Sequence, residues 1–180
     1  MDFRLIVLCF LFCIQSTTFS ATRFLAPELR VSQWFDKDCK KSNFSVIDNR
    51  GKYIILFAWQ SWCPGCHSSG FPALKKLTDE FKNSKKITFA SIQTVFEGHS
   101  SNTVDEVCST MNKFGIDVVA GHDPGDRSSN YRSTMMADYG TGGTPWFTII
   151  NPKGIVVYND FHLNATEAIK VLKGELSKVK

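Results

Sequence analysis

The chain has 180 residues, of which 43% are hydrophobic and 21% are charged, and its formal net charge is +4 at neutral pH. This is the composition of an ordinary globular protein, and it predicts one domain large enough to bury a core. Lysines and arginines are scattered, with short pairs such as Lys75-Lys76 and no long basic stripe. We therefore expect no nucleic-acid partner.

The first twenty residues differ from the rest. An apolar stretch at residues 5–14 is too short to span a bilayer comfortably, and polar residues follow it. Thr18 and Ser20 are small residues placed as a cleavage after Ser20 requires. We expect a signal peptide at residues 1–20 and a folded domain at residues 21–180, in a protein that is periplasmic or secreted. The alternative is an uncleaved membrane anchor through residues 5–14.

The pattern of apolar and polar residues predicts strands that alternate with helices. Pro72 lies inside the first expected helix, where it removes a backbone donor, so we expect a kink near Gly70-Phe71. Capping-box patterns begin at Thr103 and Asn164. Strands alternating with helices and ending in a hairpin indicate an α/β sandwich with a mixed sheet. The expected elements are strands at 29–34 and 53–59, a helix at 64–81, a strand at 87–95, a helix at 103–114, a strand at 118–120, a helix at 129–139, a hairpin of 146–150 and 155–158, and a helix at 164–178.

Two cysteines, Cys63 and Cys66, directly follow the second strand and open the first helix. A helix that begins inside this motif places Cys63 at its N-terminus, where unpaired N–H groups and the helix dipole stabilise a thiolate. Cys66, one turn later, is close enough to form a disulfide with Cys63. In this context the pair predicts a redox-active dithiol.

Exchange with a partner also needs a docking edge beside the nucleophile. Gly142-Gly143-Thr144-Pro145 directly precedes the strand at 146–150. A proline at the first residue of a strand, after a glycine pair, is a candidate for a cis peptide bond. Such a bond would leave the Thr144 carbonyl and N–H free to pair with an extended substrate. From this local pattern alone, an ordinary trans proline is favoured.

The chain carries a series of further motifs that span nearly all of residues 21–180. They are Ala26-Pro27-Glu28-Leu29, Arg50-Gly51-Lys52, the run from Phe57 to Cys66 (FAWQSWCPGC), Phe71-Pro72-Ala73-Leu74, Tyr139-Gly140, and Thr144-Pro145 through Asn151-Pro152-Lys153-Gly154. With these motifs the chain resembles the thioredoxin-like superfamily. It is most similar to the exported TlpA/ResA-type branch, which has a redoxin or AhpC-TSA-like domain.

This resemblance implies a three-layer α/β/α sandwich with a central mixed β-sheet. It also implies an exported thiol–disulfide oxidoreductase, most similar to the reductases, in which Cys63 attacks and Cys66 resolves the mixed disulfide. Pro145 would be a cis-proline that faces the dithiol, which reverses the expectation from the local pattern. The residues expected to contact the substrate are Trp62, Pro64, Gly65, Thr144 and Pro145.

The chain departs from the family at two points. Thioredoxin has a buried acid six residues before the first cysteine, and this chain has Phe57 there. The similar branch tends to carry an acid after the third strand, and Glu97 fits that position. We therefore expect Glu97 to accept the proton of Cys66. Pro72 also lies one residue further from Cys63 than in most relatives, which predicts a local bulge in the helix.

The same residues permit other sites. Cys63, Cys66 and His67 match the c-type haem attachment pattern, and the two cysteines with His162 could hold Cu(I) in a non-catalytic delivery module. A peroxiredoxin-like thiol peroxidase would share the fold, but Gln60 stands where its reactive motif usually has threonine. We expect no metal and no cofactor besides the dithiol itself.

Export would remove Cys9 and Cys13 with the signal peptide and leave four cysteines. In an oxidising compartment this even count permits a structural disulfide between Cys39 and Cys108, and two separate buried thiols are the alternative. The expected partners of this oxidoreductase are proteins with thiols or disulfides and a membrane-bound or soluble redox donor. The protein itself is expected to be a monomer.

Overall fold

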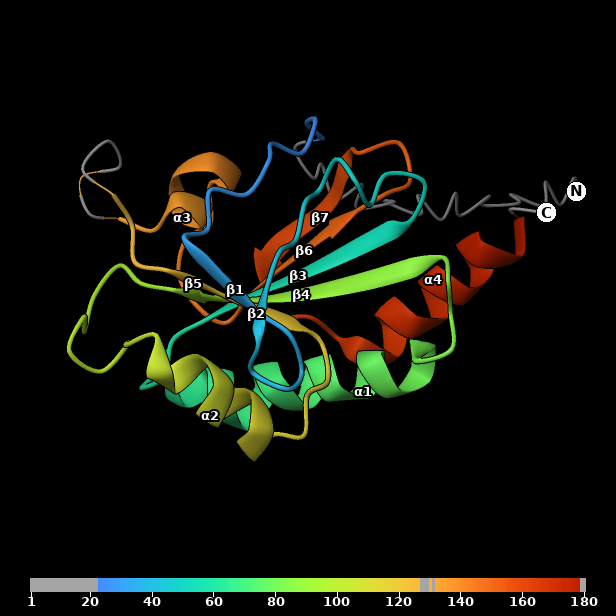
Figure 1. Cartoon of the computed structure of the whole chain (residues 1–180). Coiled ribbons are helices and arrows are strands. Elements are labelled where there is room, and N and C mark those ends of the chain that lie inside the picture. The colour runs from blue at the N-terminus through green and yellow to red at the C-terminus, as the bar shows by residue number, and fades with distance from the viewer. Residues whose placement is uncertain (1–22, 127–129, 131, 179–180) are drawn as a thin grey trace, which may run out of the picture.

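The computed structural model describes residues 23–126, 130 and 132–178, and in them one seven-stranded mixed sheet has helices on both faces (Figure 1). The expected signal peptide at residues 1–20 lies outside the described residues. None of the described helices is long and apolar enough to cross a membrane. The elements in chain order are β1 (Gln33–Phe35), β2 (Lys41–Ser42), β3 (Tyr53–Trp59), a π-helical turn η1 (Cys66–Gly70), α1 (Phe71–Phe81), β4 (Ile87–Thr94), α2 (Asp105–Lys113), β5 (Val119–Asp123), α3 (Thr134–Tyr139), β6 (Trp146–Ile150), β7 (Val156–Phe161) and α4 (Ala165–Lys178).

Strand β3, which directly precedes the two cysteines, lies inside the sheet between β4 and β6. The strand order is β2-β1-β5-β4-β3-β6-β7, in which β3 pairs in parallel with β4 and antiparallel with β6. All seven residues of β3 are buried, as the continuous apolar run of a strand covered on both faces requires. Cys63 and Cys66 follow β3 directly in the chain, so the dithiol lies at the carboxyl end of β3, where the crossover through α1 to β4 begins.

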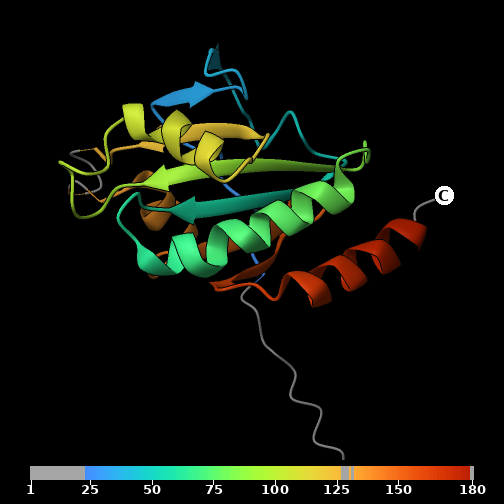
Figure 2. The ribbon, with the colours of Figure 1, turned by 90° about the horizontal axis from the view of Figure 1, so that it is seen from below.

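Helices α1, α2 and α4 cover one face of the sheet, and α3 lies on the other (Figure 1). Seen from below, α1 runs across the sheet between α2 and α4 (Figure 2). Phe57, Phe71 and Leu172 belong to the apolar core on this face. Ile54 and Tyr139 belong to a second core under α3. The expected three-layer sandwich is therefore confirmed.

The expected strand at residues 29–34 is wrong, because β1 covers only Gln33–Phe35. The carboxylate of Glu28 accepts hydrogen bonds from the backbone N–H groups of Leu29, Val46 and Ile47. These bonds hold the start of the segment against the turn at residues 45–47 instead of against a strand.

The starts of the last three helices agree with the sequence prediction in one case and depart from it in two. Ser133 caps α3 by accepting the N–H of Met136 at 3.0 Å, so the helix expected from residue 129 begins only at Thr134. Asn164 caps α4, as its pattern predicts, by accepting two backbone N–H groups. The capping box expected at Thr103 is wrong, since α2 begins at Asp105 without a side-chain cap.

Candidate active site

The two paired cysteines lie where β3 gives way to a helical segment. Helical backbone begins at Pro64, directly after Cys63, as the motif predicts. The Sγ atom of Cys63 takes the place of an N-cap oxygen and accepts the N–H of Cys66 at 3.1 Å. This bond stabilises negative charge on the Cys63 sulfur when the thiol ionises.

The two thiols differ in access to solvent. Cys63 is 6% exposed, whereas Cys66 has no exposed surface, and both are free of disulfide bonds. Burial, together with the hydrogen bond to Cys63, raises the pKa of Cys66 to about 12. Cys63 is therefore the thiol that a partner can reach, and Cys66 stays protonated at neutral pH.

The helical segment after Cys66 contains the irregularity that the sequence predicts. A helical bond from residue 72 to Ser68 would need an N–H that Pro72 lacks. The chain instead forms a π-turn over Cys66–Gly70, in which the N–H of Phe71 donates to the carbonyl of Cys66. A π-turn accommodates one extra residue, so it accounts for the expected kink and for the expected bulge.

The segment before β6 faces the dithiol from the other side. The Thr144–Pro145 peptide bond is cis. The carbonyl oxygen of Thr144 accepts a hydrogen bond from the Cys63 thiol at 3.5 Å. A groove of about 510 Å³ opens there, and its walls include the five residues expected to contact a substrate, namely Trp62, Pro64, Gly65, Thr144 and Pro145.

Two aromatic side chains at the groove are unusually exposed. Trp62 is 46% exposed and Phe161, at the end of β7, is 42% exposed. Both line the groove, together with Phe96 and His162. Large apolar side chains left in water beside a reactive thiol are typical of a surface that binds another molecule.

Glu97 lies on the wall of the same groove. Its side chain is exposed, and among the described residues its carboxylate accepts no hydrogen bond from either cysteine. Cys66 lies buried below the groove surface. The role of Glu97 as the proton acceptor therefore stays a prediction.

Asn102, a buried polar residue that the sequence analysis did not single out, connects two loops beside the groove by hydrogen bonds. Asn102 is 3% exposed, and its Oδ1 atom accepts the N–H of Ser61 at 2.7 Å. Its Nδ2 atom donates to Oε1 of Gln60 at 3.1 Å and to the carbonyls of Glu97 and Gly98 at 3.1 and 3.0 Å. One side chain thus connects the loop before Cys63 to the loop that carries Glu97.

A second set of polar contacts continues behind the dithiol loop. Ser61 accepts a bond from Nε2 of Gln93 at 2.7 Å, and Oε1 of Gln93 lies 2.6 Å from Nδ1 of His122. Burial lowers the pKa of His122, which favours the neutral imidazole. Polar residues in the buried strand β4, such as Gln93, were the sequence signal for this network.

The haem and copper alternatives depend on His67 and His162, which lie in different surroundings. Nε2 of His67 lies 2.7 Å from the carbonyl of Ser61, and its ring packs against Phe71 and Phe114. His162 lines the groove with Cys63. Within the described part of the chain, no three histidine, cysteine or acidic side chains are grouped so as to hold a metal ion.

Cys39 and Cys108 form a disulfide in the structure, with their Cα atoms 5.8 Å apart. Cys39 lies in the turn between β1 and β2, and Cys108 lies in α2. The bond therefore ties the edge of the sheet to a helix. Neither Cys39 nor Cys108 lines the groove beside Cys63.

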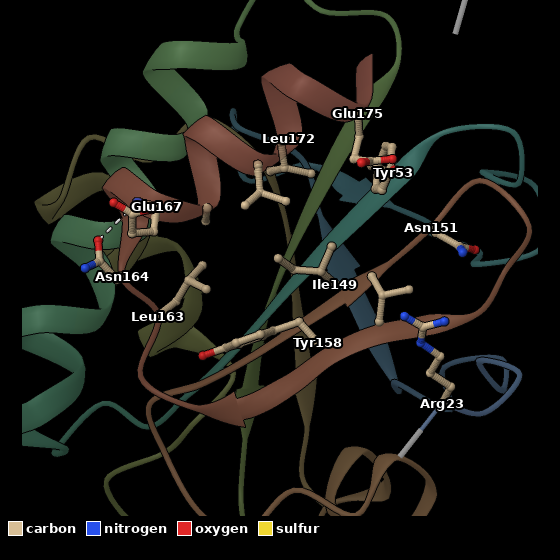
Figure 3. Close-up of a pocket in the computed structure, with 13 residues that line it drawn as sticks. Arg23, Tyr53, Ile149, Asn151, Tyr158, Leu163, Asn164, Glu167, Leu172 and Glu175 are labelled. Atoms are coloured by element: carbon tan, nitrogen blue, oxygen red, sulfur yellow. Dashed lines mark hydrogen bonds between the residues drawn. The ribbon is translucent and has the colours of Figure 1, made fainter. Parts of the chain in front are cut away.

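A larger hollow, of about 630 Å³, lies between α4 and the β6–β7 hairpin (Figure 3). Its wall is apolar at Ile149 and Leu172 and polar at Tyr158, Glu167 and Glu175. No cysteine or histidine lines it. Thiol chemistry therefore belongs to the smaller groove.

Comparison with known proteins agrees with this fold. No curated protein matches the chain significantly. The thioredoxin-like superfamily protein SPOA0173 is 29% identical, with 83% of this chain and 94% of that chain covered and a TM-score of 0.72. A structure described as a thiol-disulfide isomerase from Corynebacterium glutamicum is 26% identical, with 84% and 94% covered and a TM-score of 0.70.

A thiol:disulfide interchange protein from Chlorobium tepidum, 21% identical, covers 85% of this chain and 96% of its own length with a TM-score of 0.61, and it shows the fold alone. At the level of sequence, the Redoxin family matches residues 19–174, which is most of the chain. The chain belongs to the Redoxin family, and its fold and paired cysteines are those of a thiol–disulfide oxidoreductase.

Proposed function

We propose that this protein is an exported reductase that exchanges disulfides with partner proteins through Cys63 and Cys66. The observation that carries the proposal is the position of the Cys63 sulfur. It accepts the N–H of Cys66 on one side and lies 3.5 Å from the Thr144 carbonyl, at the groove, on the other. A stabilised sulfur beside an open backbone edge is what attack on a protein disulfide needs.

In the first step the Cys63 thiolate attacks one sulfur of the partner's disulfide. The partner's S–S bond breaks, a mixed disulfide forms at Cys63, and the second partner sulfur leaves as a thiolate that takes up a proton. In the second step Cys66 loses its proton and attacks the Cys63 sulfur. The Cys63–Cys66 disulfide forms, the partner leaves as a dithiol, and two electrons have passed to it. A redox donor with a thiol pair then returns the two electrons.

The second step needs a base because Cys66 is protonated at neutral pH, with its pKa raised to about 12. We assign this role to Glu97, the carboxylate on the groove wall. A partner that covers the groove would exclude water and bring the mixed disulfide under this side chain. The Glu97→Gln variant should therefore slow the second step and leave the first step unchanged.

The reductase direction is the one that the resemblance to the TlpA/ResA-type branch implies. Export is supported by the Cys39–Cys108 bond, since structural disulfides are typical of oxidising compartments.

The partner surface is expected to be an extended segment that contains the disulfide. Such a segment can pair with the backbone of Thr144 and place apolar side chains against Trp62 and Phe161. We therefore expect the groove to favour protein substrates over small thiols.

The test uses the Cys66→Ser variant and a disulfide-bonded protein such as insulin as the probe. Without the resolving thiol, a mixed disulfide with Cys63 should accumulate and appear on a non-reducing gel. The Cys63→Ser, Cys66→Ser variant is the control and should trap nothing. Full turnover by the Cys66→Ser variant would contradict the mechanism. Rapid oxidation of Cys63 by hydrogen peroxide without any exchange would instead favour a thiol peroxidase.

A further inference from the structure

Two glycines of the dithiol helix lie directly against the ring of Pro145. Gly70 is buried at the end of the π-turn, and a Cβ atom built on it would lie 2.9 Å from Cβ of Pro145. A Cβ atom on Gly65 would lie 3.3 Å from Cδ of the same ring. Real Cβ atoms essentially never approach another atom to 2.9 Å, so only glycine fits at position 70 in this arrangement.

The π-turn is the reason that both glycines face this ring. Its bond from Phe71 to Cys66 spans five residues, which is also the separation of Gly65 and Gly70. In a regular α-helix, residues five apart point in different directions, because they lie about 1.4 turns apart. The extra residue before Pro72 thus brings a second glycine under Pro145.

On the side of Gly70 away from Pro145, the ring of Phe57 could not move to make room for a side chain at position 70. There the added Cβ would lie 2.8 Å from Cζ of Phe57. Phe57 is fully buried, with its ring 5.1 Å from that of Phe71 and 4.7 Å from that of Phe147. A ring held between two others cannot move away at low cost.

With Phe57 held in place, the clash at position 70 would fall on Pro145, and displacing Pro145 changes the site. It is joined to Thr144, whose carbonyl lies 3.5 Å from the Cys63 sulfur, and its own carbonyl accepts the N–H of His162 at 3.4 Å. Displacing the ring therefore shifts the backbone edge relative to the nucleophile and loosens it from His162.

We propose that Gly70 is a positioning residue for disulfide exchange, which sets the distance between the Cys63 sulfur and the Thr144–Pro145 edge. This inference rests on the proposed function, because it concerns how a partner segment is placed. Gly70 has no part in ionising the thiol. Its loss should therefore impair reaction with a protein disulfide and spare reaction with a small disulfide that needs no backbone edge.

The test compares the Gly70→Ala variant with the wild type on insulin and on a small aromatic disulfide, 5,5′-dithiobis(2-nitrobenzoate). Misplacement of a reacting edge by about 1 Å costs up to roughly a hundredfold in rate, so we expect a loss of about tenfold or more on insulin. We expect a change of less than about twofold on the small disulfide. The control is Gly174→Ala in α4, where an added Cβ meets nothing within 4 Å, and it should match the wild type on both probes.

A second variant keeps the test decisive if Gly70→Ala does not fold. In the Phe57→Leu, Gly70→Ala variant the contact with the Phe57 ring is removed and the contact with Pro145 remains, and Phe57→Leu alone is its reference. A selective loss on insulin in this pair supports the inference. Equal rates on insulin, or an equal loss on both probes, would overturn it. If the wild type itself does not react with insulin, the proposed function fails instead.

Discussion

Replacing Asn102 by alanine should weaken the whole fold, and the size of the effect follows from its contacts. The side chain is 3% exposed and connects Ser61, Gln60 and the carbonyls of Glu97 and Gly98. Alanine removes one accepting oxygen and two donated hydrogens. It also leaves their partners inside the protein without water to replace the lost bonds.

Each such hydrogen bond contributes about 1 kcal/mol net, so the loss should be about 3 kcal/mol in the free energy of unfolding. For a domain of this size, each 1 kcal/mol shifts Tm by about 2–4 °C, so Tm should fall by roughly 6–12 °C. Exchange with a protein disulfide should slow as well, because the loop of Glu97 is no longer tied to the loop before Cys63.

The assay is urea denaturation followed by tryptophan fluorescence, with the Asn112→Ala variant as a matched control. Asn112 is exposed on α2, and its replacement should change the free energy of unfolding by less than about 0.5 kcal/mol. If Asn102→Ala unfolds within 0.5 kcal/mol of the wild type as well, the polar network does not hold the groove together and the reasoning is refuted.

Removing the disulfide with Cys39→Ser, Cys108→Ser should cost about 4 kcal/mol in denaturant titrations, because the bond closes a loop with a separation of 69 residues; a loss under about 1 kcal/mol would contradict this. Asn164→Ala should lower the free energy of unfolding by about 1 kcal/mol in thermal melts, because it removes the cap of α4. The reduced protein should lose stability above about pH 9, by up to about 1.4 kcal/mol per pH unit, because burial keeps Cys66 protonated while the unfolded chain ionises. The oxidised form has no Cys66 thiol to titrate, so parallel pH profiles of the two forms would count against this reading.

The parts of the site that are local in sequence could be predicted. The buried strand, the two cysteines and the start of a helix at Pro64 are neighbours in the chain, and the pattern shows them together. Pro72 marked the irregular turn for the same reason, since its missing N–H acts on the residues just before it. The three layers and the mixed sheet followed from the family resemblance.

The contacts that join distant segments could not be predicted. Asn102 lies 41 residues from Ser61, and nothing near it in the sequence shows that the two loops meet. The approach of Gly70 to Pro145 depends on how the π-turn rotates the helix, which the spacing of Pro72 suggests but does not determine. The first strand was mispredicted because the bonds of Glu28 to residues 46 and 47 outweigh local alternation.

The central claim is that Cys63 and Cys66 form one reversible redox couple with reducing power. The most direct measurement equilibrates the wild type in buffers of defined thiol–disulfide potential, alkylates the free thiols and identifies them by mass spectrometry. We predict that Cys63 and Cys66 titrate together as a two-electron couple near the thioredoxin value of about −270 mV, while Cys39 and Cys108 stay joined. Two cysteines that remain thiols at every potential would contradict the claim, and a couple near about −120 mV would contradict the reductase direction.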